Sequence, residues 1–305
     1  MKKNFSHAIM LLAAAMVLSQ CGQQMRSTGA DDGGYSESNP VASSGDIVVS
    51  NGASDSILLL DPDGFYKALL FNADNTSESP GGVTYNTDTN EVVFVVDGAD
   101  RLAAVSLTDL TYRNVVTSTL LSGVLRGITQ LINGDYLIIE SNVIERYTAD
   151  GFPAGSPWPR SGLQTNPNGI SARAAGGFVM CSYGTDVVRT YDDSGTQIAT
   201  ASSGIAGTTD AYACTELSNG NIAVAWSGTT DTIQIRSPDL STVIASYSNT
   251  SILGDPEGIA EDNDGNLLIT DGTFHHIVVI DSSANFVTIK ANSVLNLPRW
   301  LFVVP

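Results

Sequence analysis

A short apolar strand preceded by a turn occurs six times along this chain at nearly constant spacing. The copies begin at G-D-I-V-V-S (45), N-E-V-V-F-V-V-D (90), G-D-Y-L-I-I-E (134), G-G-F-V-M-C-S (176), G-N-I-A-V-A-W (220) and G-N-L-L-I-T-D (265). Successive copies start 45, 44, 42, 44 and 45 residues apart. Short strands joined by Gly, Asp and Asn turns at such a period are typical of the blades of a β-propeller.

Each copy is the second strand of a larger unit. A first strand precedes it and opens near a small residue, as in R-G-I at 126 and E-G-I at 257. A third strand follows and runs into an acidic turn, and a weaker fourth strand comes after it, as in F-V-T-I at 286. We therefore expect blades of four strands.

The two ends of the domain complement each other. The first unit lacks its leading strand, and the chain finishes with an unmatched strand, L-P-R-W-L-F-V-V-P, from 297. A last strand that completes the first blade closes the ring and hides its edges, whereas a two-domain arrangement leaves both ends unmatched. The sequence thus predicts an all-β, six-bladed propeller with blades at 45–72 plus 297–304, 80–117, 125–152, 167–200, 210–247 and 256–291.

One segment resembles a known repeat. D-P-E-G-I-A-E-D-N-D-G-N-L-L-I-T-D-G-T-F-H-H-I-V-V-I-D, from 255, is similar to an NHL repeat, and N-P-N-G-I-S-A-R-A-A-G-G-F-V-M-C-S, from 166, is a weaker copy. The resemblance implies a six-bladed propeller. The family includes lactonases, amidating lyases and many non-catalytic binding proteins, so the resemblance by itself selects no function.

The N-terminus predicts export. M-K-K-N-F-S-H is followed by the apolar run A-I-M-L-L-A-A-A-M-V-L, the form of a secretory signal. L-S-Q-C resembles the lipobox of bacterial lipoproteins, with Gln20 in place of the usual small residue and Cys21 as the lipidated residue. We expect a signal peptide at 1–20, a lipid-anchored flexible tether at 21–44, rich in Gly, Ser, Asp and Asn, and the propeller at 45–305. An ordinary cleaved signal or an uncleaved anchor is the alternative.

This arrangement places the protein outside the cytoplasm. We expect it to be anchored by lipid to the cell envelope, with the outer membrane favoured, and to face the periplasm or the cell surface. The lipid would be its sole contact with the membrane, and the propeller would be monomeric.

The charge limits the classes of partner. The chain has 14 basic and 32 acidic residues, so loss of Lys2 and Lys3 with the signal leaves 12 against 32, a net charge near −20. Such a surface repels nucleic acid and anionic headgroups. A solvated exported surface is the simplest interpretation, and a cationic partner also fits.

Two motifs that suggest chemistry are interpreted as structural. Cys181 and Cys214 lie in predicted core strands, where two buried free thiols are favoured over a disulfide. His275 and His276 are adjacent, so in a strand they point to opposite faces and cannot readily chelate one ion. We expect one to pack toward a neighbouring blade and the other to face the turn, with Asp271 as a hydrogen-bond partner.

The candidate site is the face on which first strands begin and second strands end, which we call the top face. The residue before each small residue is expected to point into the central channel, which gives an inner ring of Arg299, Gly81, Arg126, Asn168, Tyr212 and Glu257. The ends of the second strands form a wider ring of Ser50, Asp97, Glu140, Ser182, Trp226 and Asp271, with Tyr183 beside it. From these we take as binding candidates Arg126, Asn168, Tyr212, Glu257, Arg299, Asp97, Glu140, Tyr183, Trp226 and Asp271.

Catalytic interpretations have little support in these rings. Calcium-dependent lactonases of this fold use Glu, Asn and Asp at the inner positions, whereas here Asn168 and Glu257 alone offer side-chain oxygens of that kind. No histidine stands in the inner ring to bind zinc, and no G-x-S-x-G elbow is present. We expect no metal or cofactor. Carboxylate catalysis by Glu257 with Asp97, Glu140 or Asp271 stays open.

The arginines and aromatic residues favour binding. Glu257 and Arg299 are expected to form an ion pair between neighbouring blades, while Arg126 could engage a carboxylate or phosphate group. Trp300 replaces the small residue of its strand and is expected to wedge the closing blade. We therefore predict a non-catalytic, membrane-tethered binding module that presents its top face to a protein or peptide partner. The alternatives are a lactonase-like hydrolase or lyase acting on a small substrate, and a structural spacer of the envelope.

Overall fold

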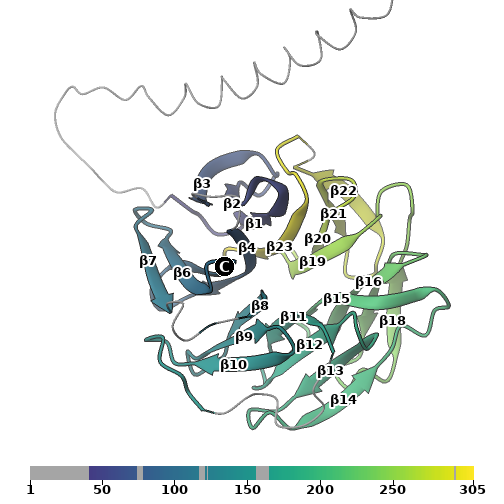
Figure 1. Cartoon of the computed structure of the whole chain (residues 1–305). Coiled ribbons are helices and arrows are strands. Elements are labelled where there is room, and N and C mark those ends of the chain that lie inside the picture. Colours follow the sequence, from purple (N-terminus) through teal and green to yellow (C-terminus); the bar gives the residue numbers. More distant parts are fainter. Residues whose placement is uncertain (1–40, 74–77, 117–120, 122, 156–164, 292) are drawn as a thin grey trace, which may run out of the picture. The chain divides into compact units, whose positions relative to one another are not determined.

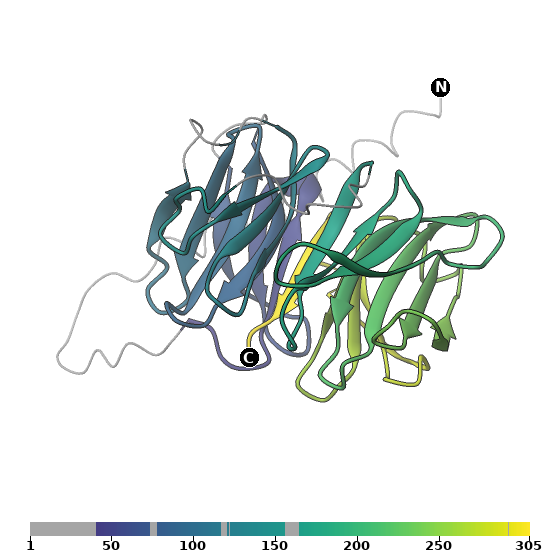
Figure 2. The same ribbon diagram turned by 90° about the horizontal axis from the view of Figure 1, so that it is seen from below.

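The computed structural model describes residues 41–73, 78–116, 121, 123–155, 165–291 and 293–305. These residues form six antiparallel sheets arranged around a central channel (Figure 1). Seen from below, the sheets stand side by side, with the last strand of the chain among them (Figure 2). The predicted six-bladed all-β propeller is confirmed. No helix in the described part of the chain is long and apolar enough to cross a bilayer.

The first three blades follow the predicted boundaries closely. Blade 1 contains β23 (Pro298–Val303), β1 (Ile47–Asn51), β2 (Ser56–Leu60) and β3 (Tyr66–Asn72), with a short 3-10 turn, η2 (Gly52–Ser54). Blade 2 contains β4 (Ser79–Asn86), β5 (Glu91–Asp97), β6 (Arg101–Ser106) and β7 (Tyr112–Val116). Blade 3 contains β8 (Leu125–Gln130), β9 (Tyr136–Glu140) and β10 (Val143–Tyr147).

The other three blades have four strands each. Blade 4 contains β11 (Pro167–Ala172), β12 (Phe178–Ser182), β13 (Val187–Tyr191) and β14 (Gln197–Ala201). Blade 5 contains β15 (Thr208–Glu216), β16 (Ile222–Gly228), β17 (Thr232–Arg236) and β18 (Val243–Tyr247). Blade 6 contains β19 (Pro256–Glu261), β20 (Leu267–Asp271), β21 (His276–Ile280) and β22 (Phe286–Lys290).

Blade 3 differs from the predicted four strands. Within the described residues it has three, and a single bridge between Tyr147 and Pro153 stands where a fourth would begin. Pro153 lacks an N–H, and a proline is tolerated at a sheet edge but weakens pairing there. This departure lies on the outer side of the blade, away from the channel.

The ring closes as predicted. β1 pairs antiparallel with β2 on one side and with β23 on the other, in a register that sets Ile47 opposite both Leu60 and Val303. Each innermost strand contacts the innermost strands of its two neighbours, in the order β23, β4, β8, β11, β15, β19 and back to β23. Neighbouring blades therefore meet at their innermost strands all the way around the channel, while the six sheets stay separate.

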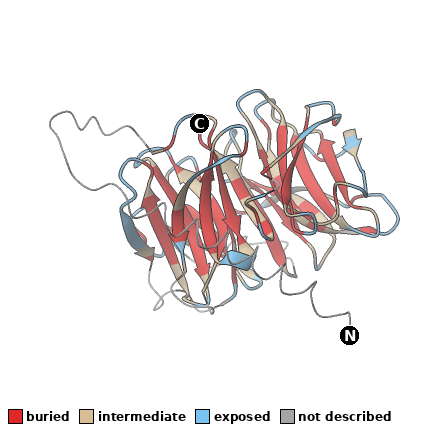
Figure 3. Ribbon diagram, turned by 90° about the horizontal axis from the view of Figure 1, so that it is seen from above, coloured by how far each residue is buried: buried red, intermediate tan, exposed pale blue. Residues whose placement is uncertain are grey.

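The core is divided among the junctions between blades. Alternate residues of a strand point to opposite faces, so each central strand serves two junctions. Val48 belongs to the cluster between blades 1 and 2, whereas Ile47 and Val49 belong to the cluster between blades 6 and 1. Figure 3 shows the result, with most strands buried and with exposed residues in the turns and at the outer edges of the blades. The near-continuous apolar runs of the second strands are explained by burial on both faces.

The small residue in the first strands of blades 2 to 6 allows neighbouring blades to approach. A Cβ added to Gly82 would lie 2.7 Å from the carbonyl oxygen of Arg126, and one added to Gly169 would lie 2.8 Å from the Cα of Ala213. Both are closer than real Cβ contacts, so the backbones would have to separate. The small residue is thus required by the close packing of innermost strands.

Many of the acidic turns have a structural role. The carboxylates of Asp61, Asp192, Asp262 and Asp281 each accept backbone N–H groups from residues two and four positions further on. Such turns tie the third strand of a blade to the fourth, or the first to the second. In each turn the residue three positions after the aspartate has a positive φ, namely Gly64, Gly195, Gly265 and Ala284. Part of the negative charge of the chain is therefore explained by turn formation.

The histidines and cysteines are held by the fold. His275 Nδ1 accepts the N–H of Leu297 at 2.8 Å, in the segment leading to blade 1, and His276 Nε2 lies 2.8 Å from the carbonyl oxygen of Ile252. Asp271 is a hydrogen-bond partner through its backbone, since its carbonyl oxygen accepts the N–H of His275 at 3.0 Å, whereas its carboxylate accepts other backbone N–H groups. Cys181 and Cys214 are free and buried, as favoured by the sequence.

Residues 41–44 precede the predicted start of the propeller at residue 45 but contact it. Val41 and Ala42, which we assigned to the tether, direct their N–H groups to the carbonyl oxygen of Leu107 in blade 2. Asn263 in blade 6 donates to Ser44 Oγ at 2.9 Å. Residues 41–44 are therefore packed against the propeller. Cys21 and the predicted signal peptide lie outside the described residues.

Candidate binding site at the mouth of the channel

The top face is assembled by strand pairing. In an antiparallel pair the start of one strand lies beside the end of the other, and here Ser79 pairs with Asp97, Leu125 with Glu140, and Pro256 with Asp271. The register shifts next to the inner position in each first strand, for example between Pro256 and Gly258. Such bulges re-aim a side chain, which here directs the inner-ring residues toward the channel.

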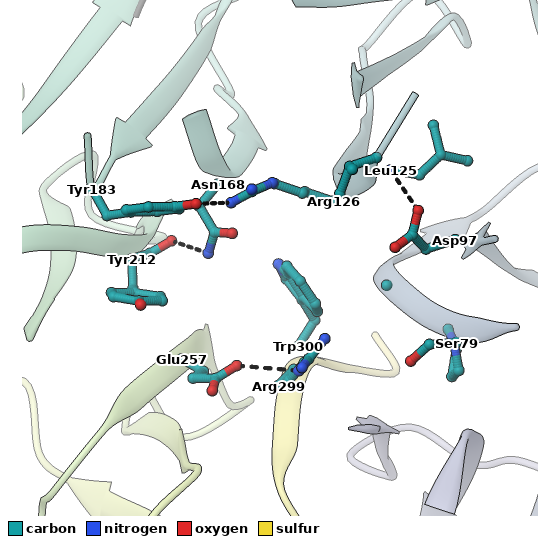
Figure 4. Close-up of a pocket in the computed structure, with 13 residues that line it drawn as sticks. Ser79, Asp97, Leu125, Arg126, Asn168, Tyr183, Tyr212, Glu257, Arg299 and Trp300 are labelled. Atoms are coloured by element: carbon teal, nitrogen blue, oxygen red, sulfur yellow. Dashed lines mark hydrogen bonds and ion pairs between the residues drawn. The ribbon is translucent and has the colours of Figure 1, made fainter. Parts of the chain in front are cut away.

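A cavity of about 280 Å³ occupies the mouth of the channel at this face. Its walls come from all six blades, and the six inner-ring positions all contribute (Figure 4). Asp97 and Tyr183 line it too, together with Ser79, Pro80, Val124, Leu125 and Trp300. A volume near 300 Å³ suits a small molecule or a single group of a larger ligand.

Three of the sequence candidates lie elsewhere. Trp226 is fully buried between blades 4 and 5, with the Arg236 guanidinium over its ring at 5.9 Å, because alternation in β16 turns its side chain into that junction. Asp271 is fully buried too, and its carboxylate accepts backbone N–H groups of Gly254 at 2.6 Å and Phe274 at 2.7 Å. Neither side chain lines the cavity, and core packing, the alternative for Trp226, describes its position. Glu140 does not line the cavity.

One wall of the cavity consists of two stacked tyrosines and an arginine. The rings of Tyr183 and Tyr212 have centroids 5.4 Å apart and planes 15° apart. The Tyr183 hydroxyl accepts Arg126 Nη1 at 2.7 Å. Burial raises the pKa of Tyr212 to about 12, so its hydroxyl stays protonated at neutral pH. This wall combines a flat aromatic surface with a cationic edge.

The opposite wall holds a carboxyl–guanidinium pair. Arg299 Nε lies 3.6 Å from Glu257 Oε2, which is an ion pair at a distance too long for a hydrogen bond. Burial raises the pKa of Glu257 to about 7, and Arg299 only partly offsets that effect. Asp255 and Asp271 add negative charge nearby, and burial also raises the pKa of Asp255. The predicted ion pair is present, but it leaves Glu257 partly protonated near pH 7.

Trp300 forms the floor of the cavity. It stands at the position that is glycine or alanine in the other first strands (Gly82, Gly127, Gly169, Ala213 and Gly258), and its indole projects into the middle of the ring (Figure 4). The same side chain lines a second cavity of about 140 Å³ deeper in the channel. The indole thus separates the two cavities, because the smaller residues around it leave the channel open at this level.

Asn168 and Asp97 are oriented by the backbone of neighbouring blades. Asn168 Nδ2 donates to the carbonyl oxygen of Tyr212 at 3.0 Å, and Asp97 Oδ1 accepts the N–H of Leu125 at 3.1 Å. Each side chain therefore links the mouth of one blade to the next. The sequence analysis did not select Leu125, Val124 or Ser79 as lining residues. Their position just ahead of the small residue of a first strand could have indicated that they lie at the top face.

The raised pKa of Glu257 predicts a pH dependence of stability. A free glutamic acid ionises near pH 4.3, so between that pH and about 7 the folded chain binds more protons than the unfolded chain. The free energy of unfolding therefore falls as pH rises through this window, by about 3 kcal/mol from this group. Glu257→Gln is expected to remove that fall, so urea denaturation should find it close to wild type at pH 4 and more stable at pH 8.

Glu91 provides a control of opposite sign. A hydrogen bond from Arg113 lowers the pKa of its carboxyl, so this group adds stability above the unfolded pKa and loses it as pH falls. Glu91→Gln should therefore be less stable than wild type at pH 8. Parallel stability curves for wild type and Glu257→Gln from pH 4 to 8 would contradict the assignment.

The described residues contain no group of three or more His, Cys, Asp or Glu side chains placed to hold a metal ion. The polar side chains that line the cavity provide two guanidinium groups, two carboxyl groups, an amide, two phenols, a serine hydroxyl and an indole N–H. These groups can form hydrogen bonds and ion pairs with a ligand of mixed polarity.

Comparison with known proteins identifies the fold of this chain and no family. No protein-family model matches the chain, and no curated protein matches it either. Among solved structures, the crystal structure of a nidogen/laminin complex aligns with a TM-score of 0.68 and 14% identity, over 85% of this chain and 98% of that one. A protein of unknown function from Bacteroides caccae aligns with a TM-score of 0.66 and 14% identity, over 86% and 99%.

A streptogramin B lyase structure is also similar, with a TM-score of 0.61 and 16% identity, over 75% of this chain and 74% of that chain. Identities this low establish the propeller fold alone. The fold therefore occurs both in a structure of a protein complex and in an enzyme. The choice between a binding function and a catalytic one depends on the site.

Proposed function

We propose that this protein is a non-catalytic binding module whose top face binds a protein or peptide partner. A lipid would anchor it to the cell envelope, outside the cytoplasm. The observation that carries the proposal is the cavity at the mouth of the channel, which joins a flat pair of tyrosines to hydrogen-bonding groups from every blade. Rigid aromatic surface next to arginine is the composition that anchors protein partners.

Further observations support this choice. Val124 lines the rim of the cavity and is 48% exposed, so apolar surface extends outward from the mouth. Catalysis by paired carboxylates loses one of its predicted residues, because Asp271 is buried and bonded to backbone N–H groups. The propeller in the nidogen/laminin complex is a precedent for a protein partner on this fold.

A hydrolase or lyase is the second candidate, because Glu257 has a pKa of about 7 inside the cavity and could exchange a proton near neutral pH. The streptogramin B lyase is a precedent for chemistry on a propeller. Turnover of a small ester, lactone or cyclic peptide that is lost in Glu257→Gln would favour this function over binding alone.

Site-specific photo-crosslinking in cells tests the proposal. A benzoylphenylalanine at Val124 samples the top face, and one at Ile132 samples the turn between β8 and β9 at the other end of the same blade, where that residue is 71% exposed. We expect a discrete crosslinked adduct from Val124 and none from Ile132. Adducts from Ile132 alone would place the partner on the opposite face and refute the proposal.

The tether is tested in the same cells. The lipobox-like L-S-Q-C supports lipidation of Cys21, so Cys21→Ser should move the chain from the membrane fraction to the soluble fraction. If the variant stays with the membrane, the lipid anchor is refuted while the binding face is not.

A further inference from the structure

Three buried N–H groups without a hydrogen-bond partner belong to side chains that line the cavity. They are Arg126 Nε, Arg299 Nε and Trp300 Nε1. A buried donor left without an acceptor destabilises the fold, so such groups are normally satisfied. Three of them around one cavity indicate a site that receives hydrogen-bond acceptors.

Arg126 presents the edge that fits a carboxylate. Its Nη1 is occupied by the Tyr183 hydroxyl at 2.7 Å, which leaves the Nε and Nη2 side of the guanidinium unbonded. The ion pairs among the described residues do not include Arg126, whereas Arg299 is paired with Glu257. No carboxylate of the described residues therefore forms an ion pair with Arg126, and a planar fork of this kind binds carboxylates through two parallel hydrogen bonds.

Trp300 adds a neutral donor aimed at the same region. Figure 4 shows the indole nitrogen directed from the middle of the ring toward the side where Arg126 and Asn168 lie. An indole N–H can only donate, so its partner must be an acceptor. The guanidinium and the indole thus both require a hydrogen-bond acceptor.

The surroundings favour a single negative charge over a double one. Glu257 and Asp97 line the same cavity, and the whole chain carries a net charge of −18, so a dianion would meet repulsion on entry. The stacked tyrosines offer a flat surface for the part of the ligand that bears the charged group.

We infer that the cavity receives one carboxylate group of the ligand, held by the free edge of the Arg126 guanidinium and by the indole N–H of Trp300. This inference rests on the proposed binding function and names the chemistry that the partner presents. The carboxylate can come from a peptide C-terminus or from an acidic side chain, and the two sources are distinguished by the probes below.

The test is an NMR titration of the full chain at constant ionic strength, observed at the Trp300 indole N–H resonance, which Trp300→Phe identifies. The probes are Ac-Gly-Gly with a free C-terminus, Ac-Glu-amide with a free side-chain carboxylate, their neutral analogues Ac-Gly-Gly-amide and Ac-Gln-amide, and inorganic phosphate. We expect a saturable shift with at least one of the two carboxylates and none with the neutral amides. Equal shifts with the amides, tighter binding of phosphate, or no shift at all would overturn the inference.

Arg126→Gln should weaken carboxylate binding at least tenfold, because hydrogen bonds between charged groups contribute about 1.5–3 kcal/mol. Arg113→Gln removes the same charge from a site on the outer strand of blade 2 and should bind like wild type. The Trp226 indole resonance, deep between blades 4 and 5, reports whether each variant is folded. Should Arg126→Gln unfold, Arg126→Lys, which keeps the charge but lacks the fork, is expected to bind more weakly than wild type. Undiminished binding by the folded variant used would refute the role of Arg126.

The outcomes separate this inference from the proposed function. A crosslink at Val124 with no response to carboxylates would retain the binding face and reject the carboxylate site. Carboxylate binding without a crosslinked protein would retain the site and reject a protein partner in favour of a small organic acid.

Discussion

Gly258→Ala is expected to destabilise the propeller by about 3 kcal/mol, because its methyl group would enter the junction where the ring closes. A Cβ at this position would lie 2.7 Å from Thr270 Oγ1 and closer still to the carbonyl oxygen of Arg299. Thr270 donates its hydroxyl hydrogen bond to that same carbonyl. Relief would require β19 and β23 to separate, and with them blades 6 and 1.

Thermal unfolding followed by circular dichroism measures this effect. For a domain of this size we expect the midpoint to fall by on the order of 10 °C. Ala213→Gly is the matched control, since it removes a Cβ from the equivalent position of blade 5 and should cost about 1 kcal/mol. A midpoint for Gly258→Ala within about a degree of wild type would mean that the blades do not approach this closely.

Trp300→Ala is expected to cost about 3–4 kcal/mol and to join the two cavities of the channel. The indole separates a cavity of about 280 Å³ from one of about 140 Å³, and it packs against the core between blades 1 and 2. Truncation to alanine removes that packing, and the glycines of the neighbouring strands have no side chains to fill the space.

Urea denaturation measures the loss, and Trp300→Phe is its control. Phenylalanine keeps an aromatic ring in the channel, so the variant should lose less than half as much stability, while it lacks the indole N–H that the carboxylate site requires. Equal losses in both variants would show that the ring itself does not support the channel.

Among the other effects, the Glu257 titration connects stability with the site. The group that lowers stability above pH 7 lies in the proposed binding cavity, together with Arg126, which forms no ion pair with a carboxylate of the described residues. Strained electrostatics of this kind are common at functional sites and are retained there at a cost in stability.

The sequence by itself determined the architecture of this protein. Apolar second strands at a spacing of 42–45 residues, a small residue in most first strands, and complementary ends were sufficient to predict six blades and a ring closed by the last strand. These signals are local or periodic, because every blade packs against its neighbours through the same alternation of buried residues.

The tertiary structure decided the chemistry of the site. The period of the strands predicted Trp226 and Asp271 at the top face. In the structure the Trp226 indole packs between blades 4 and 5, and the Asp271 carboxylate accepts backbone N–H groups. The unpaired donors of Arg126 and Trp300, and the pKa of Glu257, depend on which groups from different blades meet at the mouth of the channel. Such contacts join side chains of different blades that are distant in the chain, and the repeat period does not specify which of these side chains meet or how deeply each is buried.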